Sequence, residues 1–135
     1  MVVVDTAVWA AWFNAEKNGY TERLRRALDA EEDLGIAPDI LTEVLQGFRT
    51  DAGFRAASAM LLEVPLLSLD ADGYVAAAQL FRSLRKRGVT VRGAVDCIIA
   101  QTCLAAGAEL LSPDRDFAAM ARHTGLRMCR IESRV

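Results

Sequence analysis

Acidic side chains stand at separated points of the chain, each close to a place where the sequence pattern predicts the end of a strand or the beginning of a helix. These residues are Asp5, Glu43, Asp96, Asp114 and Asp116. Carboxylate oxygens are the ligands that Mg²⁺ and Mn²⁺ prefer, and a bound divalent ion can activate water for phosphodiester hydrolysis. The residue types therefore predict a metal-dependent hydrolase, provided that the fold brings these segments together.

Asp96 carries the strongest physical argument of the five. It is the only charged residue from Gly93 to Ala108, in a segment typical of a buried helix. An ionised aspartate there costs on the order of several kcal/mol unless it is paired or bound to metal. Two alternatives need no metal: the carboxylate is stabilised by about 0.3–1 kcal/mol at the positive helix N-terminus, or it pairs with Arg92.

The other acids have plainer explanations when each is taken alone. Asp5 suits the N-cap of a helix, and Asp114 and Asp116 lie in a Ser-Pro-Asp-Arg-Asp-Phe segment that favours a turn and a helix start. Glu43 points about 150° away from the centre of the apolar stripe of its helix, as a surface residue would. A helix packed inside a sandwich can still turn a second face to a cleft, so this geometry leaves a ligand role open.

Short apolar runs alternate with helical patterns along the chain, which predicts an α/β fold with a parallel sheet. The expected strands are 2–4, 34–37, 66–69, 109–112 and 126–131. The expected helices run from about Thr6 to the Asn18-Gly19 break, from Thr21 to the acidic run 31–33, from Pro38 onward, and over 51–62, 72–87, 93–106 and 117–123. Because ligands bind beyond the carboxyl ends of such strands, the acids are expected at one edge.

The bulk properties indicate one domain over residues 1–135. Hydrophobic residues make up 53% and the net charge is −2, which argues against binding nucleic acid by electrostatics alone. Three widely spaced cysteines in apolar surroundings indicate reduced thiols. With no apolar run near the ~20 residues of a membrane span and no signal peptide, we expect a cytoplasmic protein without membrane contact.

Taken jointly, the acidic segments resemble the motifs of PIN-domain ribonucleases. The matching segments are Val-Val-Asp-Thr-Ala-Val-Trp at 3–9, Ile-Leu-Thr-Glu-Val at 40–44, Val-Asp-Cys-Ile-Ile-Ala at 95–100 and Leu-Leu-Ser-Pro-Asp-Arg-Asp-Phe at 110–117. The length and the Val-Arg-Gly-Ala-Val-Asp stretch are most similar to VapC-type toxins of bacterial toxin–antitoxin pairs. The resemblance covers essentially the whole chain.

The resemblance implies an α/β/α sandwich around a five-stranded, mostly parallel sheet, and an Mg²⁺- or Mn²⁺-dependent endoribonuclease. It implies an antitoxin that neutralises the enzyme, and a homodimer. It assigns the catalytic and metal-binding quartet to Asp5, Glu43, Asp96 and Asp114, with Asp116 as a further ligand. Thr6 matches a hydroxyl near the metal, and Ser112 stands where the family often has Thr or Ser.

Residues around the acids suggest how RNA and the antitoxin are bound. Arg115, between two candidate ligands, is the best candidate for a phosphate contact; a second basic group precedes Asp96, although such residues at helix ends are usually solvated. That group is Arg82, Arg85, Lys86, Arg87 and Arg92. The aromatic stripe Trp9, Trp12 and Phe13 forms either core or an antitoxin groove. The only histidine is His123, which disfavours metal-free cleavage through the RNA 2′-OH.

Three other functions compete with this interpretation. A non-catalytic, acidic metal-binding signalling module of the receiver type needs a lysine near the site, but neither Lys17 nor Lys86 follows a strand. A phosphatase of the haloacid dehalogenase type needs a second aspartate where this chain has Ala7. A PIN nuclease with a housekeeping role in RNA processing is the closest alternative.

Overall fold

Four short parallel strands form the centre of the computed structural model, which describes residues 1–132. Their order is β2-β1-β3-β4, with β1 (Val2–Val4) between β2 (Leu34–Gly35) and β3 (Glu109–Leu111), and β4 (Arg127–Met128) beside β3. Val3 lies opposite Gly35 on one side and Leu110 on the other. The first strand of the sequence therefore occupies the middle of the sheet.

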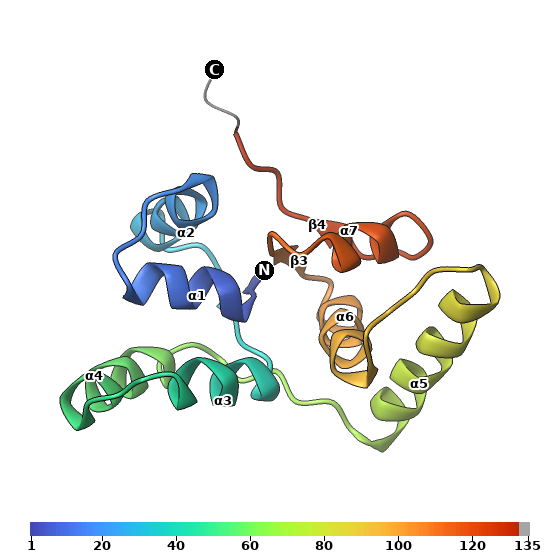
Figure 1. Cartoon of the computed structure of the whole chain (residues 1–135), viewed down its shortest axis with the longest axis horizontal. Coiled ribbons are helices and arrows are strands. Elements are labelled where there is room, and N and C mark those ends of the chain that lie inside the picture. Colours follow the sequence, from blue (N-terminus) through green and yellow to red (C-terminus); the bar gives the residue numbers. More distant parts are fainter. Residues whose placement is uncertain (133–135) are drawn as a thin grey trace.

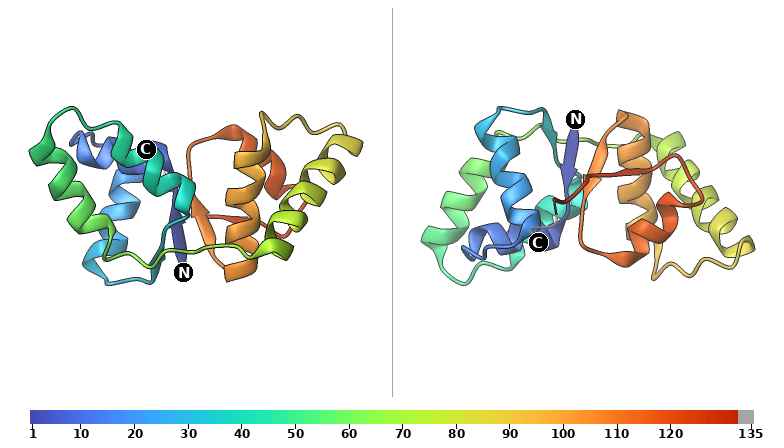
Figure 2. Two further views of the ribbon diagram at one scale, coloured as in Figure 1. Left: turned by 90° about the horizontal axis from the view of Figure 1, so that it is seen from below. Right: turned by 90° about the horizontal axis from the view of Figure 1, so that it is seen from above.

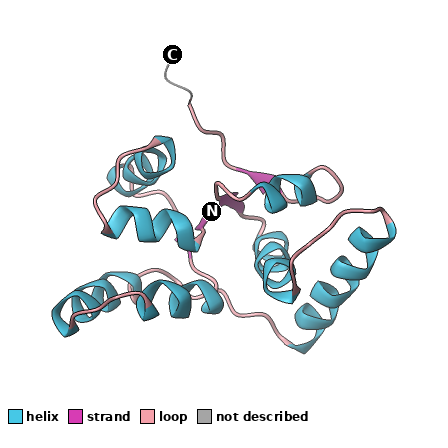
Figure 3. Ribbon diagram, in the orientation of Figure 1, coloured by secondary structure: helices cyan, strands magenta, loops and turns pink. Residues whose placement is uncertain are grey.

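Helices cover the strands from two sides. The first four lie on one side: α1 (Thr6–Phe13), α2 (Gly19–Asp29), α3 (Pro38–Gln46) and α4 (Asp51–Leu61). The other three lie across the strands from them: α5 (Ala71–Lys86), α6 (Ala94–Ala106) and α7 (Arg115–Ala121). Figures 1 and 2 show this arrangement from three directions, and Figure 3 shows how small the strands are beside the helices. The expected α/β/α sandwich is confirmed.

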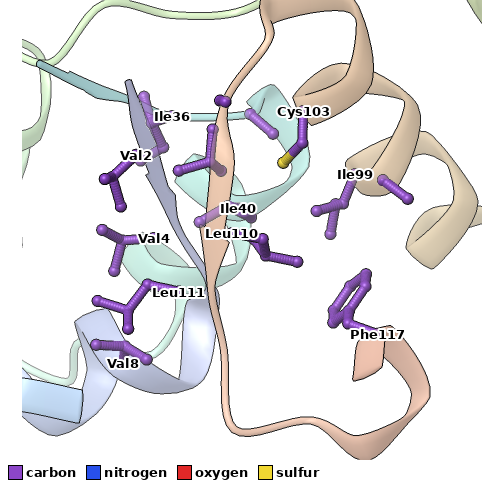
Figure 4. Close-up of a cluster of buried hydrophobic side chains, with 14 of the residues drawn as sticks. Val2, Val4, Val8, Ile36, Ile40, Ile99, Cys103, Leu110, Leu111 and Phe117 are labelled. Atoms are coloured by element: carbon purple, nitrogen blue, oxygen red, sulfur yellow. The ribbon is translucent and has the colours of Figure 1, made fainter. Parts of the chain in front are cut away.

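Both faces of the sheet are buried, which explains why its strands are apolar runs and do not alternate with polar residues. Figure 4 shows Val4 and Leu111 on the side of Val8 from α1, and Leu110 on the side of Ile99 and Phe117. Leu110, Val4 and Val3 are completely buried. The core thus fixes β1 and β3 side by side, and with them the residues that follow each strand.

The expected third strand, at 66–69, is wrong as a strand, because only an isolated bridge joins Leu66 to Ile36. Pro38 is the first residue of α3 and Ala37 is its N-cap, so the chain turns into a helix directly after Ile36. No ladder can extend beyond that point, and Leu66 remains half exposed. The expected strand 126–131 is likewise shortened to Arg127–Met128.

Local capping sets two helix starts earlier than expected. The Asn18 side chain accepts from the backbone N–H of Tyr20 and Thr21, so α2 begins at Gly19 instead of Thr21. The Asp114 side chain accepts from Asp116 N–H, so α7 begins at Arg115 and not at 117. Side-chain caps of this kind satisfy donors that a helix leaves free at its first turn.

Two general expectations have structural counterparts. All three cysteines are free thiols; Cys97 and Cys103 are buried, whereas Cys129 is only half-buried. Over residues 1–132, no helix combines the length and the apolar character that a membrane crossing needs.

Candidate active site

Asp5 and Ser112 meet at the carboxyl end of the two central strands. Val4 pairs with Leu111, and the Asp5 N–H donates to the Leu111 carbonyl at 3.0 Å, which brings the next residue of each strand together. Ser112 Oγ donates to Asp5 Oδ2 at 2.7 Å, and the other oxygen, Oδ1, accepts from the Thr6 N–H at 2.8 Å. The side chain of Asp5 is thus buried and held at both oxygens.

Three further carboxylates gather beside this pair. Oxygens of Asp96, Asp114 and Asp116 lie within 4.8 Å of one another, and all three residues are half-buried. Asp96 stands in the first turn of α6, Asp114 caps α7 and Asp116 is in its first turn. Ser112 Oγ links the two groups, because it also accepts from the Asp114 N–H at 3.1 Å. An oxygen-only donor set of this kind fits Mg²⁺ or Mn²⁺.

Burial and neighbouring negative charges raise the pKa values of Asp5 and Asp96. Burial raises the pKa of Asp96, and the negative charges of Asp114, Asp116 and Asp5 raise it further. The pKa of Asp5 is raised mainly by burial, against the lowering effect of its hydrogen bonds to Ser112 and Thr6. A bound cation would offset the repulsion among clustered carboxylates and favour their ionised form. The electrostatics therefore agree with the donor chemistry.

Glu43 lies at the rim of the site and outside the three-carboxylate group. It is exposed on α3, and its Oε2 accepts from Thr6 Oγ1 at 3.2 Å. Thr6 directly follows Asp5, so this bond ties α3 to the start of α1 beside the buried carboxylate. Glu43 does lie on the exposed face of its helix, as the sequence pattern predicts, but this face is turned toward Thr6.

The expected basic contacts divide into residues near the acids and residues engaged elsewhere. Arg92 Nε lies 3.4 Å from Asp116 Oδ2, so the ion pair of Arg92 is with Asp116 and not with Asp96, the partner considered as a metal-free alternative. Arg87 donates to the His123 carbonyl at 3.2 Å, and Arg85 lies over the Phe81 ring. Arg82 donates to Gln79. Arg115 is exposed at the first position of α7, between the two acids of that segment.

A cavity of about 280 Å³ opens at the acids, with walls formed by Arg92, Gly93, Ala94, Val95, Asp96 and Asp114. A larger one, of about 590 Å³, lies between the start of α2 and the segment near Ile131. The larger cavity holds none of the clustered aspartates. The chemistry of the donors, rather than size, identifies the smaller cavity as the candidate site.

The aromatic stripe of α1 is mostly core. Trp9 is completely buried and stacks on Phe13 with ring centroids 6.1 Å apart, and Phe13 meets Phe48 edge-on at 5.4 Å. Trp12 is half-buried under the guanidinium of Arg25, which lies 5.1 Å from its ring centroid. Trp9 is therefore excluded from any docking groove, while Trp12 and Phe13 retain partly exposed edges.

Sequence and structure comparisons place these features among known proteins. The family profile described as PIN domain matches residues 2–123. Ribonuclease VapC11 of Mycobacterium tuberculosis is 32% identical over 129 residues, which cover 94% of this chain and 96% of that protein.

Two solved structures share the fold. VapBC2 from Rickettsia felis, bound to a DNA fragment from its promoter, has a TM-score of 0.76 at 17% identity and covers 98% of this chain and 100% of the other. VapC20 of Mycobacterium tuberculosis, described as a sarcin-ricin loop cleaving toxin, has a TM-score of 0.62 at 21% identity. That match covers 88% of this chain and 94% of VapC20.

Proposed function

Because the chain belongs to the PIN-domain family, and within it to the VapC ribonucleases, we propose that the acids at the carboxyl ends of β1 and β3 are its catalytic centre. The protein is an endoribonuclease that acts as the toxin of a toxin–antitoxin pair. The observation that carries the proposal is the convergence of Asp96, Asp114 and Asp116, whose oxygens lie within 4.8 Å of one another.

The donor set supports a divalent ion held by Asp96, Asp114 and Asp116, with Asp5 as a fourth ligand. We propose Mg²⁺, or Mn²⁺ in its place, because both take carboxylate oxygens. When bound, such an ion lowers the pKa of water and neutralises charge on the scissile phosphate. Ser112 fixes the Asp5 carboxylate from one side, so that this ligand keeps one orientation.

Residues at the rim would handle water and RNA. Glu43 is exposed and steered by the Thr6 hydroxyl, a position suited to accepting a proton from the attacking water. The exposed guanidinium of Arg115 would bind a phosphate beside the scissile bond. Because the 2′-OH takes no part, cleavage should leave a 5′-phosphate and a 3′-hydroxyl.

The partner of the enzyme is a cognate antitoxin protein. We propose that it inserts an amphipathic segment near the partly exposed edges of Trp12 and Phe13 and places a basic side chain among the carboxylates. We further propose that the protein works as a homodimer in the cytoplasm, where RNA and antitoxin are both present.

Cleavage assays with matched variants test the proposed centre. Purified protein is incubated with tRNA, rRNA and mRNA in Mg²⁺, in Mn²⁺ and in EDTA, beside Asp5→Asn and Asp96→Asn. Asp51→Asn is the control, since Asp51 is an exposed aspartate in the first turn of α4, away from the site. We expect both site variants and EDTA to abolish cleavage and the control to retain it. Cleavage that survives EDTA or both site substitutions would sink the proposal.

A further inference from the structure

We propose that Arg92 is a built-in counter-ion of the acidic site, which neutralises Asp116 in the metal-free enzyme and binds an RNA phosphate in the metal-loaded one. The inference rests on the proposed function, because it concerns the same carboxylates. It assigns to one arginine two successive partners of the same charge.

The first half of the proposal follows from the ion pair. Arg92 Nε lies 3.4 Å from Asp116 Oδ2, and Arg92 shares the wall of the 280 Å³ cavity with Asp96 and Asp114. Within residues 1–132, no other lysine or arginine forms an ion pair with an acid of this cluster. The guanidinium therefore places positive charge beside Asp116, one of the proposed metal ligands. Arg92 and a divalent ion thus compete for the same carboxylate.

The second half follows from exposure and from the shape of the guanidinium. The Arg92 side chain is 83% exposed although its Nε lies 3.4 Å from Asp116 Oδ2, so most of the guanidinium is open to solvent and to a second anion. A guanidinium binds phosphate through paired N–H groups, which a lysine cannot reproduce. Once Asp116 is committed to a metal ion, the nearest anion left for Arg92 is the substrate backbone.

The segment that carries Arg92 limits where its side chain can go. It connects α5 to α6, and Arg87 anchors its beginning through the bond to the His123 carbonyl, while Ala94 begins α6 at its end. Val91, directly before Arg92, packs against the core, whereas a Cβ on Gly93, directly after it, would meet nothing within 4 Å. A change of partner therefore needs only side-chain rotation at the mouth of the cavity.

This double role predicts two effects of opposite direction from one substitution. Removing the charge of Arg92 removes the cation that competes with the metal for the carboxylates, so the metal should bind more tightly. The same change removes a phosphate contact, so RNA should bind more weakly. A residue with a merely structural role would weaken both, and a simple RNA contact would leave metal affinity unchanged.

The test compares Arg92→Gln with Arg55→Gln, an exposed arginine on α4 across the strands from the site. Calorimetry with Mn²⁺ and no RNA measures metal affinity; we expect the Kd of Arg92→Gln to fall about two- to fivefold, as for a partly solvated ion pair. Steady-state cleavage of a short RNA should show a higher KM with a smaller change in kcat. The dependence of log KM on log salt should lose a slope of about 0.7, the value of one single-strand phosphate contact.

A charge-conserving variant and the wild-type protein separate the ways in which the proposal can fail. Arg92→Lys keeps the charge, so it should restore the wild-type Mn²⁺ affinity but only part of the KM. If wild-type protein binds Mn²⁺ and cleaves RNA while Arg92→Gln shows unchanged or weaker Mn²⁺ binding, or an unchanged KM, the role of Arg92 is refuted and the catalytic centre stands. If wild-type protein itself binds no Mn²⁺, the proposed centre fails, and the inference with it.

Discussion

A single serine links two of the site's aspartates. Ser112 Oγ donates to Asp5 Oδ2 and accepts from the Asp114 N–H, at the point where β3 ends. With Asp5 buried, the loss of this donor would leave a carboxylate oxygen without a partner in a place that water reaches poorly. The position of Ser112 is therefore one at which a small change should have a large effect.

Ser112→Ala should lower the free energy of unfolding by about 1–2 kcal/mol and slow RNA cleavage by about tenfold or more. Its physical cause is the loss of the hydrogen bond that lowers the pKa of Asp5. Urea titration and initial cleavage rates measure the two effects. Ser58→Ala serves as control, because the Ser58 hydroxyl donates only to the Phe54 carbonyl within α4. Equal effects of the two changes would argue against a special role of Ser112.

Asp96 illustrates the opposite relation between activity and stability. Because burial and three neighbouring carboxylates oppose its ionisation, Asp96→Asn should raise the Tm of the metal-free protein by about 2–4 °C while abolishing cleavage. Scanning fluorimetry in EDTA measures the shift. If the Tm of Asp96→Asn in EDTA is lower than that of the wild-type protein, the ionised Asp96 is stabilising, and repulsion among the carboxylates does not destabilise the metal-free protein. Asp51→Asn, which removes a favourable charge at a helix N-terminus, should not raise the Tm.

At the scale of elements, α6 positions Asp96, and its two ends have different tasks. Its first turn holds the acid, whereas its last turn ends at Gly107, which has φ +63°. A side chain at Gly107 would meet no atom within 4 Å, so only backbone strain opposes a substitution there. Stability and chemistry can thus be separated along one helix.

Gly107→Ala should cost about 1–2 kcal/mol of stability, the strain of a left-handed backbone, and leave cleavage at 25 °C unchanged. Thermal unfolding and a cleavage assay well below the Tm measure both. Gly125→Ala is the matched control: its backbone is not left-handed, and the new Cβ would lie 3.6 Å from Leu104, an ordinary contact. A large loss of activity in Gly107→Ala would mean that the whole helix, including its first turn, had moved.

The elements also show what the sequence could predict. Apolar runs identified β1 and β3 because both strands are buried on both faces, and the lone charge of Asp96 marked the start of α6. The expected strand at 66–69 failed because Ala37 and Pro38 start a helix where the ladder with Ile36 would have continued. The partner of Glu43 was beyond sequence reasoning, because it depends on how α3 lies against α1. The early start of α7 was readable in principle, since Asp114 is a good N-cap.

At the scale of the whole molecule, the raised pKa values make stability depend on pH in a direction opposite to that of an ordinary ion pair. Between the ordinary value of 3.8 and the raised values of Asp5 and Asp96, the folded state holds more protons than the unfolded state. The free energy of unfolding of the metal-free protein should therefore fall as pH rises through this window. Glu32, whose pKa is lowered by Arg23, acts in the other direction and loses its contribution as the medium becomes acidic.

A bound metal should reverse this dependence of stability on pH, because the carboxylates must lose their protons to bind the metal. With saturating Mn²⁺, we expect stability to rise with pH over the same window, and a hundredfold excess over Kd should add about 2.7 kcal/mol. Urea titrations from pH 4 to 7, with Mn²⁺ and with EDTA, measure both slopes, and Asp96→Asn should flatten each. Parallel slopes in the two media would contradict a metal site at these residues.

The pairing of β1 with β3 also has a consequence for the order in which the enzyme becomes active during translation. Asp5 leaves the ribosome 107 positions ahead of its hydrogen-bond partner Ser112. The central strand has only half of its neighbours until β3 emerges, and the cluster of Asp96, Asp114 and Asp116 is incomplete for as long. A chain cut short before β3 lacks Ser112, Asp114 and Asp116, and we therefore expect it not to cleave RNA.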